Sequence, residues 1–211
     1  MARERRPDDQ ARPTKSERAG EQPQSAEGFL HGKLLIAMPG MSDPRFERSV
    51  IFMCQHSAEG AMGLIVNKPL DLEFRELMEK MDIQTVPQAA ARHVMFGGPV
   101  DTDKGYILHS SDRSNHPPST IVVTPEIAMS LTVDMLKRVA NGSGPSRWMM
   151  ALGYAGWGPG QIESEIAANG WIHCEPDNEI IFGGGMENKW VRALDKLGAN
   201  VSGLSWQSGR A

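Results

Sequence analysis

The 211-residue chain is poor in cysteine, in tyrosine and in long apolar segments. Its only two cysteines, Cys54 and Cys174, cannot build a disulfide framework, and they suit a reducing compartment. No apolar run exceeds five residues, so we expect neither a membrane-spanning helix nor the hydrophobic segment of a signal peptide. The expected location is therefore the cytoplasm, away from any membrane.

The chain also lacks an excess of positive charge, since its formal net charge is -4. A protein that neutralises several phosphates of a nucleic acid needs the opposite sign. No helix-turn-helix pattern or basic stripe is visible either. Direct binding to nucleic acid is therefore not expected.

Residues 1–27 differ in composition from the rest of the chain. They contain six Lys or Arg, six Asp or Glu, three prolines and no aromatic residue. Such a segment cannot bury enough apolar surface to offset the entropy of ordering, and the prolines interrupt the alternative of a basic amphipathic helix. We expect a disordered arm at 1–27, followed by a single domain at 28–211.

Beyond the arm, short apolar runs alternate with turn residues, a pattern typical of strands. The runs are KLLIAM, RSVIFMCQ, MGLIVN, HVMFG, GYILH, STIVVT, RWMMAL, WIHC and EIIF. Several neighbouring runs are joined by turns too short for a crossover helix. The pattern predicts about nine strands in a mixed, largely antiparallel sheet.

Helices are fewer in this pattern. Apolar residues at i, i+3, i+4 and i+7 predict helices at 71–81, with Asp71 as N-cap, and at 187–198, with Gly198 suited to the C-cap. A third helix is expected after a glycine-rich loop, at 160–169. With a fourth helix, described next, the predicted class is α+β with about four helices.

The segment TPEIAMSLTVDMLKRVANG fits two structures. Pro125 could begin one long helix, whereas the alternation of Ile127, Met129 and Leu131 is typical of a strand. We favour a hairpin that turns at Pro125 and Glu126, followed by a short helix with Thr132 as its N-cap.

The glycine-rich stretch ALGYAGWGPGQIESEIAANGW, residues 151–171, resembles a phosphate-binding loop because a strand precedes it and a helix follows. Its spacing differs, since Gln161 or Glu163 stands where the third glycine of a dinucleotide fingerprint belongs. The Gly-Lys-Ser/Thr of a P-loop is absent. Glu163 and Glu165 lie where the helix dipole favours each of them by roughly 0.3 to 1 kcal/mol, and they would repel a phosphate. No nucleotide cofactor is expected.

Two other roles remain for this loop. Its glycines would let Tyr154 and Trp157 pack close to backbone. Alternatively, Tyr154, Gln161 and Glu163 would supply polar contacts to an uncharged or cationic group. A further glycine pair, within Gly97, Gly98 and Pro99, signals a tight turn or bulge where the backbone passes close to a neighbour.

A zinc site is the tempting interpretation of the histidines and cysteines. Cys54 and His56 are two residues apart on a predicted strand, so we expect them on one face. His173 and Cys174 would complete a set of four ligands. Consecutive strand residues point to opposite faces, however, so those two cannot easily reach one ion. No metal is expected.

His56 is also a candidate acid or base, because imidazole titrates close to neutral pH. Its carboxylate partner would be Glu163 or Asp43. A single histidine in a turn more often stabilises the turn by hydrogen bonds. No G-x-S-x-G motif is present, so a serine nucleophile has no support.

The motifs LLIAMPGMSDPRFERSVIFMCQHSAEGAMGLIVNKP, FGGPV, GYILH and LGYAGWGPGQIESEIAANGW together resemble the AlgH-type family of bacterial proteins, also called the YqgE family. The resemblance covers residues 32–198 and implies an α+β fold whose bifurcated sheet rolls into a barrel-like body. Family members are described as transcriptional regulators or as uncharacterised, and no catalytic mechanism is implied. The matching elements are Asp43 and Phe46, 56–63, 97–99 and 153–163.

We therefore predict a regulatory or ligand-binding protein without intrinsic catalysis or cofactor, acting through a protein partner or a small ligand. The alternative is a hydrolase or transferase that uses His56 with Glu163 or Asp43, which requires a carboxylate within hydrogen-bond reach of the histidine. The candidate binding residues are Asp43, His56, Asn67, Gly98, Tyr154, Trp157, Gln161 and Glu163.

Overall fold

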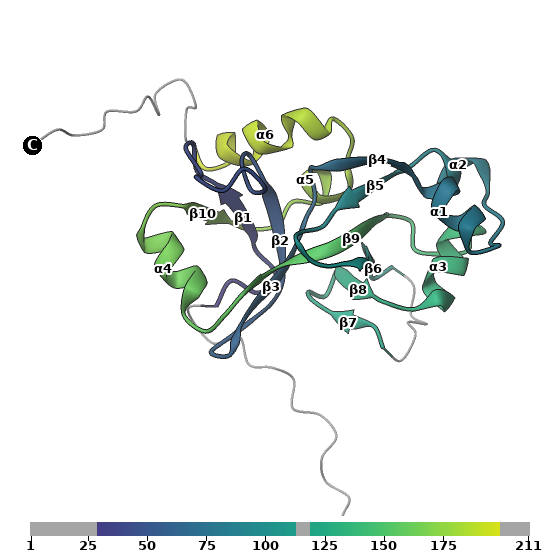
Figure 1. The fold of residues 1–211 in the computed structure, drawn as a ribbon, viewed down its shortest axis with the longest axis horizontal. Coiled ribbons are helices and arrows are strands. Elements are labelled where there is room, and N and C mark those ends of the chain that lie inside the picture. Colours follow the sequence, from purple (N-terminus) through teal and green to yellow (C-terminus); the bar gives the residue numbers. More distant parts are fainter. Residues whose placement is uncertain (1–28, 113–118, 199–211) are drawn as a thin grey trace, which may run out of the picture.

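The computed structural model describes residues 29–112 and 119–198, and it shows an α+β fold built on one curled, half-barrel sheet (Figure 1). The predicted arm at 1–27 lies outside the described residues. The strands are β1 (Leu34–Ala37), β2 (Val50–Ser57), β3 (Gly60–Ile65), β4 (Pro69–Glu73), β5 (His93–Phe96), β6 (Val100–Ser110), β7 (Ile121–Val122), β8 (Ile127–Ser130), β9 (Trp148–Trp157) and β10 (Trp171–Cys174).

The sheet is largely antiparallel, and one strand belongs to both of its halves. Its strand order is β10-β1-β2-β3-β9-β6-β8-β7, while β4 and β5 form a branch alongside β9. The end of β9 pairs with β3, and its earlier residues pair with β6 and, in parallel, with β5. This branching at β9, visible across the middle of Figure 1, confirms the bifurcated sheet that the resemblance implied.

Helices cover the sheet on several sides (Figure 1). They are α1 (Phe74–Lys80), α2 (Pro87–Ala90), α3 (Val133–Ala140), α4 (Gln161–Ala167), α5 (Asn178–Phe182) and α6 (Lys189–Asp195), with a 3-10 turn η1 (Met186–Asn188). The expectation of about four helices missed α2 and α5, both short. No helix in the described part of the chain is long and apolar enough to cross a membrane.

Alternation along β2 divides the apolar core. Phe52 faces the cluster covered by α5 and α6, whereas Ile51 and Met53 face a second cluster that includes Ile162 of α4. A third cluster packs α1, α2 and α3 against the other half of the sheet, around Trp148. The glycine-rich stretch up to Trp157 is part of β9, and α4 after it lies over one distinct face of β1, β2 and β3.

The local signals at helix ends were partly correct. Thr132 is the N-cap of α3 and accepts a hydrogen bond from the Met135 amide, and the strand pair β7 and β8 confirms the predicted hairpin. The predicted N-cap Asp71 was wrong, because β4 pairs with β5 and keeps the chain extended until Glu73.

The run EIIF was predicted as a strand, but it forms α5. The Asp177 carboxylate accepts hydrogen bonds from the amides of Glu179 and Ile180, which begins a helix there. Ile180 and Ile181 are buried among the residues under α6. A run of four residues is too short for its periodicity to separate the two structures.

Candidate functional site

A β-bulge determines where His56 points. The register of β2 against β3 shifts between Met53 and Gln55, so Cys54 stays in one core cluster while His56 lies on the opposite side, with its ring 5.0 Å from that of Phe29. The expectation that Cys54 and His56 share a face was therefore wrong. Burial raises the pKa of the Cys54 thiol to about 12, which makes it a poor nucleophile.

The other two candidate zinc ligands, His173 and Cys174, also point in different directions. Cys174 is buried, whereas His173 beside it on β10 is exposed. Within the described residues, no three side chains of His, Cys, Asp or Glu lie close enough to hold a metal ion.

His56 and Glu163, 107 positions apart in the sequence, meet in the structure. Nε2 of the imidazole lies 2.8 Å from Oε1 of Glu163, and Nδ1 accepts a hydrogen bond of 2.9 Å from the Leu30 amide. Because Nδ1 accepts, Nε2 carries the ring proton and donates it to the carboxylate. Both nitrogens are engaged and the side chain is 2% exposed, so no nitrogen faces an incoming substrate.

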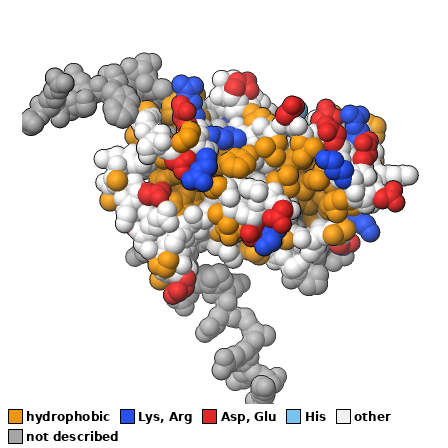
Figure 2. All heavy atoms as spheres, viewed as in Figure 1, with side chains coloured by type: hydrophobic (Ala, Val, Ile, Leu, Met, Phe, Trp, Pro, Cys, Tyr) orange, Lys and Arg blue, Asp and Glu red, His pale blue; other side chains and the backbone are white. Residues whose placement is uncertain are grey.

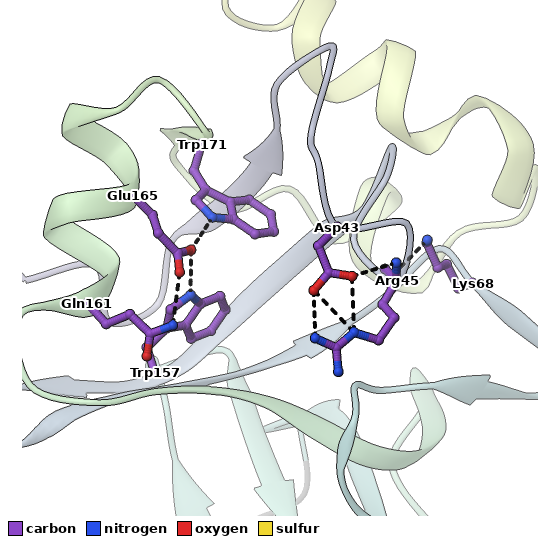
Figure 3. A network of polar contacts seen from close by, with 7 residues as sticks. All are labelled: Asp43, Arg45, Lys68, Trp157, Gln161, Glu165 and Trp171. Atoms are coloured by element: carbon purple, nitrogen blue, oxygen red, sulfur yellow. Dashed lines mark hydrogen bonds and ion pairs between the residues drawn. The ribbon is translucent and has the colours of Figure 1, made fainter.

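The first turn of α4 holds Glu163, as the sequence predicted, but Glu165 has a role that the sequence did not show. Its Oε2 accepts hydrogen bonds from the indole Nε1 of Trp157 at 3.0 Å and of Trp171 at 2.8 Å, and Oε1 accepts one from Gln161 at 2.9 Å (Figure 3). We call these four residues the indole–carboxylate cluster. Three donors compensate the partly buried carboxylate.

The cluster also determines the conformation of the glycine loop. Gln161 accepts a hydrogen bond from the Gly158 amide, so one side chain joins the loop to the carboxylate of Glu165. Gly160, the N-cap of α4, has φ +68°, a conformation that favours glycine. Two buried tryptophans need acceptors for their N–H groups, and that need was the available sequence signal for Glu165.

The loop between β1 and β2 covers this cluster. The ring of Phe46 lies 5.6 Å from that of Trp171 and 6.4 Å from that of Trp157. In the same loop, both carboxylate oxygens of Asp43 accept hydrogen bonds from Arg45, which lowers the pKa of Asp43 (Figure 3). Asp43 is thus paired with Arg45, and in the described part of the chain no contact joins it to His56.

The side chain of Asn67 also stabilises the loop between β1 and β2. Its Oδ1 accepts a hydrogen bond from the Val50 amide and its Nδ2 donates one to the carbonyl of Arg48, a residue with φ +52°. Lys68 donates to the carbonyl of Arg45, and burial lowers the pKa of Lys68. Arg45 and Lys68 were not predicted, and both act on the loop that carries Asp43.

The backbone at Gly98 passes close to a neighbour, as the sequence predicted for the turn at 97–99. A Cβ at this position would lie 2.1 Å from the carbonyl carbon of Tyr154, and φ is +151°. Gly97 meanwhile donates to the Leu152 carbonyl and accepts from the Ile65 amide. The close neighbour is therefore β9 itself, and this turn brings the two halves of the sheet together.

A groove of about 630 Å³ opens beside the end of β9, and we call it the tyrosine groove. The chain's only two tyrosines, Tyr106 and Tyr154, line it with their ring centroids 5.8 Å apart. Neither hydroxyl forms a hydrogen bond within the described residues. Polar and apolar side chains line the rest of the groove, among them Gln55, Glu59, Met62, Asp101 and Trp157.

The predicted residues thus separate into groups. Tyr154 and Trp157 reach the tyrosine groove, and Trp157 also belongs to the indole–carboxylate cluster with Gln161. His56 pairs with Glu163 on the neighbouring face of α4. Three predicted residues serve the backbone elsewhere, namely Asp43, Asn67 and Gly98.

Solved structures share this fold. The solution structure of the AlgH protein from Pseudomonas aeruginosa matches with a TM-score of 0.71 and 38% identity, covering 90% of this chain and 100% of that one. The crystal structure of protein DIP2367 from Corynebacterium diphtheriae matches with a TM-score of 0.64 over 78% of this chain and 85% of that one. At 20% identity, the second likeness shows the fold alone.

Sequence relatives agree with this likeness. A UPF0301 protein of Bradyrhizobium diazoefficiens is 48% identical over 200 residues, 91% of this chain and 93% of the relative. A UPF0301 protein of Ruegeria pomeroyi is 50% identical over 183 residues, 86% of this chain and 99% of the relative. The AlgH-like family model matches residues 34–202. The chain therefore belongs to the AlgH-like family.

Proposed function

We propose that this protein is a cytoplasmic regulatory binding protein without intrinsic catalysis, and that its tyrosine groove receives an uncharged or cationic group. The observation that carries this proposal is the pair of tyrosine hydroxyls that line the groove without a hydrogen-bond partner in the described residues. At about 630 Å³ the groove lies within the range of roughly 300 to 1,000 Å³ typical of small-molecule sites.

Charge supports this choice of ligand. Glu59 and Asp101 line the groove, and no lysine or arginine is among the described residues that line it. Lys104, outside the lining, pairs with Asp101 at 2.7 Å, whereas Glu59 forms no ion pair with any residue that the structure describes. An anionic ligand would be repelled, whereas an amine or a neutral polar group would find acceptors in Glu59 and Gln55 and hydroxyls in the tyrosines.

Regulation would then proceed through the bound ligand or a partner protein rather than through direct contact with DNA. The face drawn in Figure 2 supports this, since its basic and acidic side chains are interspersed around apolar ones instead of forming a basic stripe.

A second candidate is a hydrolase or transferase in which Glu163 orients His56. The 2.8 Å contact between them favours it, because it meets the distance that proton transfer requires. Such a reaction needs one ring nitrogen for the substrate, and Leu30 and Glu163 occupy both. A ligand can enter the tyrosine groove without displacing Leu30, His56 or Glu163. Binding is therefore the function that we favour.

The test is a thermal-shift screen of metabolites, amines and nucleotides, because a ligand that binds only the folded form raises the melting midpoint. A hit is then titrated against Tyr106→Phe and Tyr154→Phe, which remove one hydroxyl each and keep the rings. We expect amine or neutral polar hits that bind the variants several-fold more weakly. Hits restricted to phosphorylated compounds, or hits that both variants bind unchanged, would refute this assignment.

His56→Gln is the matched control for the second candidate. It removes the imidazole but lies outside the groove lining, so binding of the hit should not change. A hit whose chemical turnover by the wild type disappears in His56→Gln would instead establish the enzyme.

A further inference from the structure

A second cavity, of about 280 Å³, lies between the start of β9, the beginning of β5 and the segment that links α5 to α6. Four methionines line it, so we call it the methionine pocket: Met95, Met149, Met150 and Met186. It shares no lining residue with the tyrosine groove. Methionine side chains are flexible and polarisable, and they adapt to apolar ligands of varied shape.

The pocket contains a buried cation. Lys189, at the start of α6, is only 1% exposed and lines the cavity. Its Nζ donates hydrogen bonds of 3.0 Å to the carbonyls of Val66 and Ile181, which leaves one ammonium proton without an acceptor in the described residues. No carboxylate in that part of the chain forms an ion pair with it. A buried ammonium without a counter-charge is costly unless something compensates it.

A second cation lines the same cavity. Arg92 donates a hydrogen bond of 2.7 Å to the Trp148 carbonyl, and its guanidinium lies 4.6 Å from the centroid of the Trp148 ring. These contacts hold the group in place but bring no negative charge to it. Among the described residues that line the pocket, none is Asp or Glu.

Desolvation acts on both cations in the same direction, fully on the buried Lys189 and in part on Arg92, which stays exposed. Desolvation lowers the pKa of Lys189 to about 8 and also lowers the pKa of Arg92. The positive charge of Arg192 on α6 lowers the pKa of Lys189 further. A negative group in the cavity would offset the desolvation of both at once.

We propose that the methionine pocket binds a small organic anion, whose carboxylate contacts Lys189 and Arg92 while its apolar body packs against the methionines. The cavity volume lies just below the usual range for ligand pockets, so the fitting ligand is small, such as a short-chain carboxylate. This site and the tyrosine groove have opposite charge preferences. The two proposals therefore stand or fall separately.

The probe is sodium hexanoate, with hexanamide as a neutral control of similar shape, and the readout is NMR of [13C-methyl]methionine-labelled full-length protein. Hexanoate is expected to shift the methyl signals of Met95, Met149, Met150 and Met186 with saturation at millimolar concentration. Met62, which lines the other groove, should not move. Hexanamide should bind about tenfold more weakly, because it lacks the charge.

Two substitutions test the cations. Lys189→Met keeps much of the side-chain volume and should weaken hexanoate binding about tenfold or more, since a buried charged contact is lost. Arg92→Gln, at an exposed position, should weaken it several-fold without risk to the core. Lys137→Met makes the same change as the first at an exposed position on α3 and should have no effect.

Three results would overturn the proposal. They are pocket methyl signals that do not respond to millimolar hexanoate, hexanamide binding as tight as hexanoate binding, and hexanoate affinity unchanged in Arg92→Gln. If Lys189→Met does not fold, Arg92→Gln decides. Because the groove is tested with other ligands and other variants, a failure here leaves the proposed function intact, and the reverse also holds.

Discussion

Replacing the buried Lys189 by methionine should change how the stability of this protein depends on pH. Burial lowers the pKa of Lys189 from 10.5 to about 8 in the folded protein. Below pH 8 both folded and unfolded chains carry the proton, so the cost of the buried charge is constant. Between pH 8 and 10.5 the unfolded chain keeps a proton that the folded chain has lost, so the free energy of unfolding rises with pH.

The size of this effect follows from the shift. Each pKa unit corresponds to about 1.4 kcal/mol, so the full relief is about 3 kcal/mol, and about 2 kcal/mol of it is reached by pH 9.5. Lys189→Met also removes two hydrogen bonds to the carbonyls of Val66 and Ile181, which shifts stability at every pH alike. The difference in pH dependence between wild type and variant therefore isolates the charge.

The measurement is urea unfolding of wild type, Lys189→Met and the surface control Lys137→Met at pH 7, 8.5 and 9.5. The wild type should gain about 2 kcal/mol relative to Lys189→Met between the lowest and highest pH, and Lys137→Met should follow the wild type. If wild type and Lys189→Met show parallel profiles, Lys189 is not held in a desolvated site, and no uncompensated charge favours an anion beside it.

Other substitutions test the remaining parts of the structure. Gly98→Ala should cost more than about 3 kcal/mol in urea unfolding, because its Cβ would overlap Tyr154 backbone, whereas Gly184→Ala, with open space around it, should cost less than about 1 kcal/mol. Glu165→Gln should cost about 1 to 3 kcal/mol, because the amide keeps one acceptor oxygen and its NH2 group then faces either the Gln161 amide or the two indole N–H groups, and near-ultraviolet circular dichroism should change. His56→Gln should cost a similar amount because it disrupts the hydrogen bonds to Leu30 and Glu163, and unchanged stability would show that these two bonds contribute nothing.

Local chemistry explains what the sequence could predict about the fold. The hairpin and helix at 127–140 were predictable because alternation, a capping Thr132 and a helical period occur in succession along the chain. The prediction of Asp71 as an N-cap was wrong because the pairing of β4 with β5 overrides the local preference for a cap. The β-bulge beside Cys54 was hidden as well, since a bulge is a property of two paired strands.

The sites show the same division. The glycine loop and its first-turn Glu163 could be interpreted locally, and the pairing with His56 was weighed from the chemistry of the two side chains. Lys189 gave no signal, because it stands beside Trp190 in an amphipathic helix where lysines are normally exposed. Its burial depends on carbonyls of Val66 and Ile181, brought to it by the tertiary fold.

Strand β9 has one further consequence. Its first residues, Trp148 to Met150, border the methionine pocket, and its last, from Tyr154 to Trp157, border the tyrosine groove. Strands β3, β5 and β6 pair with it, so one hydrogen-bonded strand borders both cavities. A ligand in one cavity would change the affinity of the other only if it displaced β9, and thermodynamic reciprocity would then make that influence equal in both directions.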